Sequence, residues 1–138
     1  MSVPERGKSM NILFLIGRII FGGYFIYSAY SHFSHVANMA AYAGSKGVPA
    51  PQLAIIVTGL LLLIGGISVI LGAYPSVGLI CLIVFLVPVT FMMHAFWADS
   101  DPMAKMGNVV NFGKNLALVG ALLMMFAIRR PWPWSVIK

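Results

Sequence analysis

Four long runs of apolar residues divide this chain of 138 residues, and they constrain its fold more than any other feature. The runs cover about residues 11–31, 53–71, 77–97 and 111–128. A helix of about 20 residues crosses the hydrocarbon core of a bilayer, which is about 30 Å thick. We therefore predict an all-α fold: an integral membrane four-helix bundle, in which residues 1–138 form a single domain.

The composition requires lipid as the surrounding solvent. Only 9% of the residues are charged and 60% are hydrophobic, whereas about 25% of the residues of a typical soluble domain are charged. No basic patch is interleaved with aromatic residues, so no nucleic acid partner is expected. Cys81 is the only cysteine, which excludes an intramolecular disulfide and a cysteine cluster for iron–sulfur chemistry.

The net charge of +6 is concentrated at the two ends of the chain. Four crossings place both ends on one side of the membrane, and the side richer in lysine and arginine is normally the cytoplasm. The opposite loops carry Lys46 and Lys105. We predict that both termini are cytoplasmic and that the chain is a multi-pass protein of the bacterial inner (cytoplasmic) membrane, in contact with membrane lipid. The basic residues near the two ends are Arg6, Lys8, Arg129, Arg130 and Lys138.

All three histidines fall at the outer ends of the predicted helices. His32 and His35 end the first helix, and His94 lies near the end of the third. With Asp99 or Asp101 they could form a mixed nitrogen and oxygen metal site, and His32 or His94 could ligate haem. The spacing matches no known zinc signature, so no metal centre is predicted. The remaining interpretations are interfacial histidines bonded to backbone or water, and histidines that donate a hydrogen bond to a quinone carbonyl.

Polar residues on the first and third helices indicate where such a ligand would bind. Arg18 lies about two turns into the first helix, where a charge is costly, and it either reaches toward lipid phosphates or holds a ligand or a partner subunit. Thr90, His94 and Trp97 share one helical face by steps of four and three, although Trp97 is also typical of a membrane-interface belt. The predicted quinone or lipid contacts are His94, Trp97, His32, Thr90 and Arg18.

The fourth predicted helix opens with a polar cluster. Asn111 and Asn115 are four residues apart, and Lys114 lies between them. A lysine near a helix N-terminus is unfavourable with respect to the helix dipole, which indicates an acidic partner or a ligand. Asp99 and Asp101 are the nearest acids. We predict a structural polar pair between Lys114 and one of these aspartates, with the asparagines bonded across to neighbouring helices.

Several segments resemble the DoxX family of small four-helix membrane proteins. They are GRIIFGGYFIYSAYSHF in the first helix, the connector MAAYAGSKGVPAP, the glycine pattern of VTGLLLLIGGISVILGAYP, and HAFWADSDP followed by NVVNFGKNLALVGALLM. The resemblance places Arg18 at the family's characteristic arginine. Two positions depart from the pattern. Many members have a lysine where this chain has Ser31–His32, and a glutamate in the second helix where this chain reads LLLLIGG.

The resemblance implies the four-helix fold and an association with membrane redox complexes, because relatives include the membrane subunit of an archaeal thiosulfate:quinone oxidoreductase. We predict a non-catalytic or co-catalytic membrane subunit that anchors or completes a larger redox or energy-converting complex and holds quinone or lipid. Other membrane protein subunits are its expected partners, and no catalytic residue is assigned. The alternatives are a quinone-reactive oxidoreductase subunit with an outer-leaflet pocket, and a small transporter, although the sequence shows no internal repeat.

Overall fold

The computed structural model describes residues 3–137, with side chains from residue 7 onward. Over this range the chain forms helices and no strand: α1 (Val3–Ser34), α2 (Val36–Ser45), α3 (Pro51–Leu71), α4 (Pro75–Met93), a 3-10 turn η1 (Phe96–Ala98) and α5 (Pro102–Phe126). Four stretches are long and apolar enough to cross a membrane: Gly7–Ser34, Pro51–Leu71, Pro75–Ala98 and Pro102–Phe126. The predicted all-α membrane fold with four crossings is confirmed.

The last membrane helix begins before its apolar run, because an aspartate and a proline set its N-terminus. Asp101 caps α5, because its carboxylate accepts a 2.8 Å hydrogen bond from the backbone N–H of Ala104. Pro102 follows at the first helical position, where its missing N–H costs nothing. The helix therefore begins at Pro102 rather than near Asn111. At the other end of the preceding loop, α4 stops at Met93 rather than near Trp97.

The connector between the first two crossings contains a helix that the sequence analysis treated as a linking segment. α2 packs Ala40 and Ala43 against Ile55 at the start of α3. Val36, Met39, Ala40 and Ala43 repeat at the spacing of one helix face, but ten residues are too few to cross a bilayer. The left-handed backbone of Gly47 and Ala50 then returns the chain to Pro51, where α3 begins.

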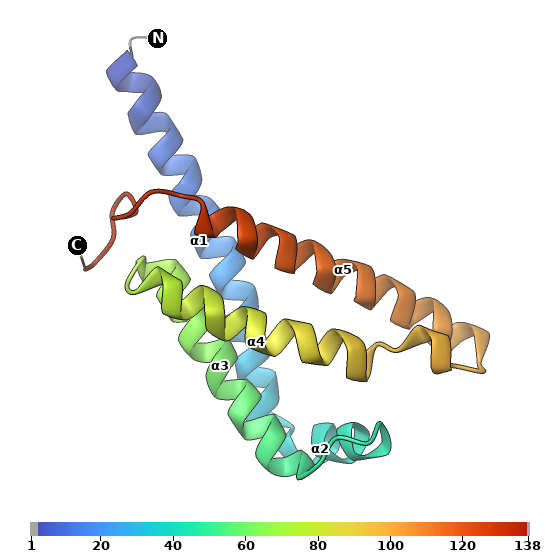
Figure 1. Cartoon of the computed structure of the whole chain (residues 1–138). Helices are drawn as coiled ribbons and strands as arrows, with labels where there is room; N and C mark the ends of the chain where they lie inside the picture. Colours follow the sequence, from blue (N-terminus) through green and yellow to red (C-terminus); the bar gives the residue numbers. More distant parts are fainter. Residues whose placement is uncertain (1–2, 138) are drawn as a thin grey trace.

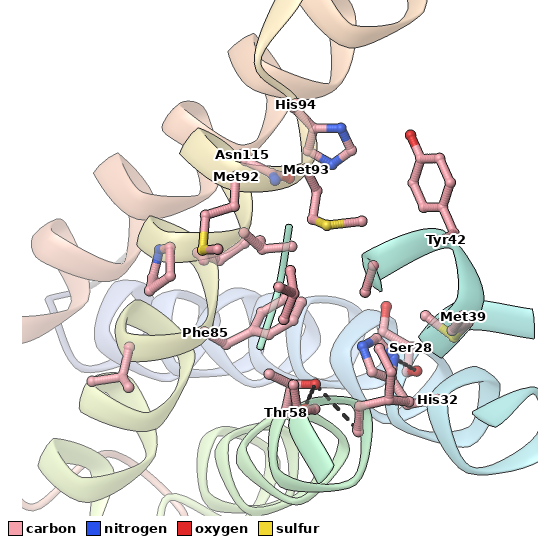
Figure 2. A pocket seen from close by; sticks show the side chains of 18 of the residues that line it. Ser28, His32, Met39, Tyr42, Thr58, Phe85, Met92, Met93, His94 and Asn115 are labelled. Atoms are coloured by element: carbon pink, nitrogen blue, oxygen red, sulfur yellow. Dashed lines mark hydrogen bonds between the residues drawn. The ribbon is translucent and has the colours of Figure 1, made fainter. Parts of the chain in front are cut away.

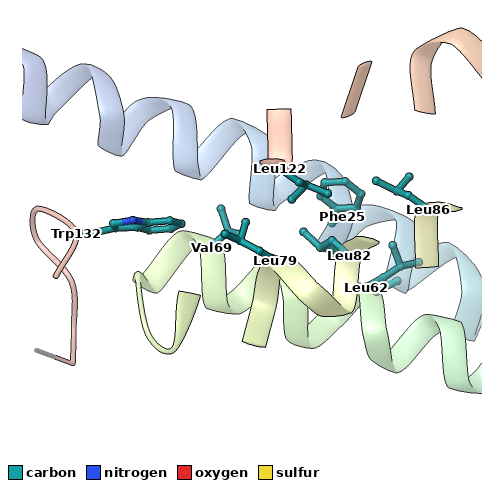
Figure 3. Close-up of a cluster of buried hydrophobic side chains, with 9 residues drawn as sticks. Phe25, Leu62, Val69, Leu79, Leu82, Leu86, Leu122 and Trp132 are labelled. Carbon is teal, nitrogen blue, oxygen red and sulfur yellow. The ribbon is translucent and has the colours of Figure 1, made fainter. Parts of the chain in front are cut away.

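The helices pack in chain order: α1 on α3, α3 on α4, and α4 on α5. Gly22 and Gly66 allow α1 and α3 to approach closely, since a Cβ added at Gly22 would lie 2.7 Å from the Gly66 carbonyl oxygen. The main hydrophobic core follows these contacts from Phe25 and Leu62 to Trp132, which lies in the segment after α5 (Figure 3). Small residues thus bring the backbones together, and apolar side chains fill the remaining space.

The two ends of the bundle differ in what they carry. The first and last described residues and the turn between α3 and α4 lie toward one end, at the left of Figure 1. α2 and the connection between α4 and α5 lie toward the other end, which we call the α2 end (Figure 1). This arrangement agrees with an even number of crossings. The α2 end contains all three histidines together with Asp99 and Asp101.

The direction of insertion is a separate prediction. We expect the α2 end to face away from the cytoplasm, because the basic residues are concentrated at the opposite end. In a Cys81→Ser background, Lys105→Cys should react with a membrane-impermeant maleimide applied to intact spheroplasts, whereas Lys8→Cys should react only after permeabilisation. Both positions are exposed on the isolated chain, so their difference in labelling measures sidedness. Labelling in the reverse order would contradict the positive-inside assignment.

Candidate functional site

A pocket of about 600 Å³ lies at the α2 end, between segments that are far apart in the sequence. Its wall takes residues from α1, α2, α3, α4 and α5 (Figure 2). Most of the wall is apolar and includes Phe25, Ile55, Phe85 and Met93. A concave, largely apolar space of this size with a few polar groups is typical of a site for a small molecule or cofactor.

His32 is one of the polar groups in this wall. It lies near the end of α1 and its side chain is only 8% exposed. Its Nδ1 lies 2.8 Å from the backbone carbonyl oxygen of Ser28. A carbonyl accepts hydrogen bonds and cannot donate one, so Nδ1 carries the hydrogen. The imidazole also packs edge-to-face on Phe85. These contacts fix the ring and leave Nε2 for a ligand.

His94 follows α4 directly and is held by a chain of three polar residues: Asn108, Asp99 and Lys46. Its Nδ1 lies 3.0 Å from Oδ1 of Asn108, and Nδ2 of Asn108 donates a 2.8 Å hydrogen bond to Asp99. Because an ionised carboxylate only accepts, the amide nitrogen must face Asp99 and the amide oxygen must face His94. Lys46 lies 3.7 Å from the other carboxylate oxygen of Asp99. His94 is therefore positioned from the loop before α3, the loop after α4, and α5.

Two residues of α5 complete the polar part of the wall. Asn115 is 5% exposed and lines the pocket. Among the side-chain hydrogen bonds of the described part of α5, none involves the Asn115 amide. Lys114 also lines the pocket, with Nζ 3.4 Å from Oδ1 of Asn111 and 5.9 Å from the ring centre of Tyr24. Figure 2 shows Asn115 and His94 in one part of the pocket and Ser28, His32 and Thr58 in another.

Arg18 was predicted as a ligand contact, but the structure places it outside the pocket. Arg18 is 1% exposed. Each of the three nitrogens of its guanidinium group donates a hydrogen bond to a backbone carbonyl. Nε donates to Val69 at 2.9 Å, Nη2 to Ile70 at 2.6 Å and Nη1 to Pro133 at 2.6 Å. Val69 and Ile70 lie in the last turn of α3, whose carbonyls have no partner within the helix. Arg18 thus joins α1, the end of α3 and the C-terminal segment, and it is neither extended toward lipid nor free for a ligand.

Thr90 and Trp97 also lie outside the pocket wall. The Thr90 hydroxyl is fully buried and donates a 2.6 Å hydrogen bond to the carbonyl of Leu86. Trp97 is 57% exposed and packs against aromatic rings, among them Phe96 and Phe112. The shared helical face predicted for Thr90, His94 and Trp97 does not form, because α4 ends at Met93. Of the five predicted contacts, the structure brings His32 and His94 to the pocket.

The predicted pair between Lys114 and an aspartate is corrected by the observed contacts. Asp99 is paired with Lys46 and Asn108, and Asp101 caps α5. Lys114 instead lies near Asn111. The earlier start of α5 is the reason, since it places Asp101 at the helix N-terminus, more than three turns before Lys114. Within the described range, no three residues among histidine, cysteine, aspartate and glutamate gather as a metal site would require.

Asn108 and Lys46 were missed by the sequence analysis. Both lie outside the four apolar runs, in segments for which the sequence predicts loops. Once α5 begins at Pro102, Asn108, Asn111 and Asn115 fall at steps of three and four, which is the spacing of one helix face. That spacing was a usable signal for a polar face on this helix. No local signal connects Lys46 to Asp99, because the two residues belong to separate loops.

The fold and the pocket together define a small four-crossing membrane protein with a ligand-sized cavity at one end. The family model named DoxX matches residues 13–95, which is more than half of the chain. The chain therefore belongs to the DoxX family. It is also similar to the inner membrane protein YphA of Escherichia coli (strain K12), with 27% identity over 121 residues that cover 88% of this chain and 86% of YphA. No solved structure gives a significant match. Four crossings and this relative identify a multi-pass inner-membrane protein.

Proposed function

We propose that this protein is a membrane subunit that holds a quinone-like or lipid-like molecule in the pocket at its α2 end, within a larger redox or energy-converting complex. The observation that carries the proposal is the pocket itself. Apolar side chains surround a volume of about 600 Å³, and His32, His94 and Asn115 place polar atoms in its wall. A ligand with an apolar body and a polar head suits such a wall, because each part finds matching chemistry.

The assignment as a subunit rests on the outer surface of the helices. In the most apolar stretch of 18 residues in α5, only 11% of the residues are buried within the chain. Large apolar side chains such as Leu123 and Met124 are 57% and 70% exposed. Lipid or a second membrane protein must cover this surface. The chain also has no extramembrane domain within the described residues that would carry out a reaction on its own.

A second candidate is a quinone-reactive oxidoreductase subunit. It is favoured by the position of His94, whose Nδ1 is held by Asn108 and whose Nε2 is left for a ligand. A histidine oriented by an amide and a carboxylate is a suitable proton acceptor or donor for a bound ring. This candidate uses the same pocket and adds proton transfer at His94.

The proposal predicts that the pocket binds a short-tailed quinone. Purified protein in mild detergent should bind decylbenzoquinone with a Kd of about 40 µM, since about 20 ligand atoms at about 0.3 kcal/mol each give about 6 kcal/mol. Ala54→Phe, which fills the pocket wall, should weaken binding at least about tenfold. Ala117→Phe, on an exposed face of α5 outside the pocket, is the matched control.

Ligands and partners retained from the native membrane provide the complementary test. Extraction in mild detergent followed by mass spectrometry should recover stoichiometric membrane protein partners and a bound quinone or lipid. A lone chain without any bound lipophilic molecule, together with no binding of decylbenzoquinone, would contradict the proposal.

A further inference from the structure

The orientation of the two pocket histidines restricts what the head group of a ligand must offer. In both rings the Nδ1–H donates to an acceptor of the protein: the Ser28 carbonyl for His32 and the Asn108 amide oxygen for His94. A neutral imidazole has one donor nitrogen and one acceptor nitrogen. Each Nε2 is therefore an acceptor in the neutral ring. The pocket presents two imidazole acceptors and no imidazole donor.

Both Nε2 atoms remain accessible to a molecule in the pocket. Trp132 Nε1 is the one side-chain nitrogen or oxygen that is fully buried without a hydrogen-bond partner in the described structure. His32 is buried, His94 is half-buried, and both line the pocket. The unpaired Nε2 atoms of His32 and His94 are thus not sealed within protein. Each Nε2 atom is therefore accessible, and the pocket is the cavity that both side chains line.

The backbone of α4 also has a carbonyl without its usual helical partner. Pro88 lies inside this helix and has no N–H, so the carbonyl of Val84 lacks its usual partner four residues later. Val84 and Pro88 both line the pocket. Donor groups in the wall include two from α5, the Asn115 amide and the Lys114 ammonium group. A ligand hydroxyl satisfies both sides, because it donates to an acceptor and accepts from a donor. A carbonyl can serve the donors only.

From this arrangement we propose that the pocket recognises a hydroxyl-bearing aromatic head group, and so binds a hydroquinone more tightly than the corresponding quinone. This inference rests on the proposed function and specifies the form of the ligand. His32 and His94 accept from the ring hydroxyls. Asn108 and Asp99 act as positioning residues, because they hold the His94 tautomer that makes Nε2 an acceptor. A carbonyl at the same place would face a lone pair on each imidazole and would leave those acceptors unpaired.

The preference is measurable as an affinity ratio and as a redox potential. The hydroquinone makes two hydrogen bonds to the histidines that the quinone cannot make, which corresponds to about a tenfold or larger difference in Kd between the two forms. Tighter binding of the reduced form raises the midpoint potential of the bound couple. For two electrons, a tenfold ratio corresponds to about 30 mV.

The experiment compares three ligands with the same ring and decyl tail on the full chain in detergent, under anaerobic conditions at pH 8, where imidazole is neutral. The ligands are the hydroquinone, its dimethyl ether and the quinone. We expect the hydroquinone to bind at least about tenfold more tightly than the other two. His94→Phe and His32→Phe keep an aromatic ring but remove the acceptor, so each should reduce the ratio. Asn108→Leu should reduce it through the His94 tautomer.

His35→Phe is the matched control, since His35 is exposed and does not line the pocket; its ratio should equal that of the unmodified chain. Equal or tighter binding of the quinone or the dimethyl ether by the unmodified chain would overturn the inference and leave the proposed function standing. Binding of none of the three ligands would overturn both. Because the comparison on the unmodified chain needs no variant, misfolding of a substituted protein cannot obscure the result.

Discussion

Replacing Arg18 by methionine is expected to destabilise the protein by about 3–5 kcal/mol, because three backbone carbonyls lose their donor and each buried acceptor left unsatisfied costs about 1–3 kcal/mol. Methionine preserves much of the apolar stem but provides no donor to the carbonyls of Val69, Ile70 and Pro133. Two of these carbonyls belong to the last turn of α3 and would remain buried without a partner. The guanidinium also lies 5.7 Å from the ring centre of Phe14 and 5.6 Å from that of Trp132, and these cation–π contacts are lost as well.

Two measurements test this expectation. Unfolding in increasing fractions of SDS should show the loss of stability, and carboxypeptidase should remove the C-terminal segment of the variant faster, because Arg18 no longer binds the Pro133 carbonyl. Arg129→Met is the control, since Arg129 is an exposed arginine near the same end of the chain. Equal stability and equal proteolysis of Arg18→Met and Arg129→Met would show that the buried bonds of Arg18 contribute little.

Replacing Gly22 by valine is expected to cost about 2–3 kcal/mol or more, because it forces α1 and α3 apart. Even the first added carbon would lie 2.6 Å from the Ile70 side chain and 2.7 Å from the backbone oxygen of Gly66. A side chain can rotate away, but the backbone of α3 cannot move without losing its own packing against α4. Overpacking of a well-filled interior usually costs 1–3 kcal/mol, and backbone contact places this site toward the upper end.

The neighbouring glycine provides a direct comparison for this prediction. A Cβ added at Gly23 meets nothing within 4 Å, so Gly23→Val should change the free energy of unfolding by less than about 1 kcal/mol. The same SDS titration measures both variants. If Gly22→Val and Gly23→Val proved equally stable, the close approach of α1 and α3 at Gly22 would be refuted.

The sequence alone was sufficient to predict the membrane class of the protein and the number of its crossings. Bilayer thickness sets the length of an apolar helix, and each run carries this information locally. The start of α5 was harder to predict, because an aspartate cap and a first-turn proline extend the helix beyond its apolar run. For α2, the periodic spacing of Val36, Met39, Ala40 and Ala43 was present, but its short length made it unsuitable as a crossing.

The candidate site was predicted in part. His32 and His94 were recognised as titratable residues at the same end of the molecule, and both line the pocket. Thr90 and Trp97 were placed on a helical face with His94 that α4 does not extend far enough to form. The partner of Lys114 was also misassigned, since Asp101 is used as a helix cap and Asp99 contacts Lys46 and Asn108.

By itself, the sequence determined that this chain must reside in lipid, cross it four times, and carry its histidines and two aspartates at one end with most of its basic residues at the other. These properties follow from transfer free energies and helix geometry, which act residue by residue. Only the tertiary structure decided which polar groups meet. The carbonyls that bind Arg18 are 51, 52 and 115 positions away, and Asn108 is 14 positions from His94. Hydrogen bonds over such separations depend on how the helices pack, because a polar group in a membrane takes whichever partner the packing brings within about 3 Å.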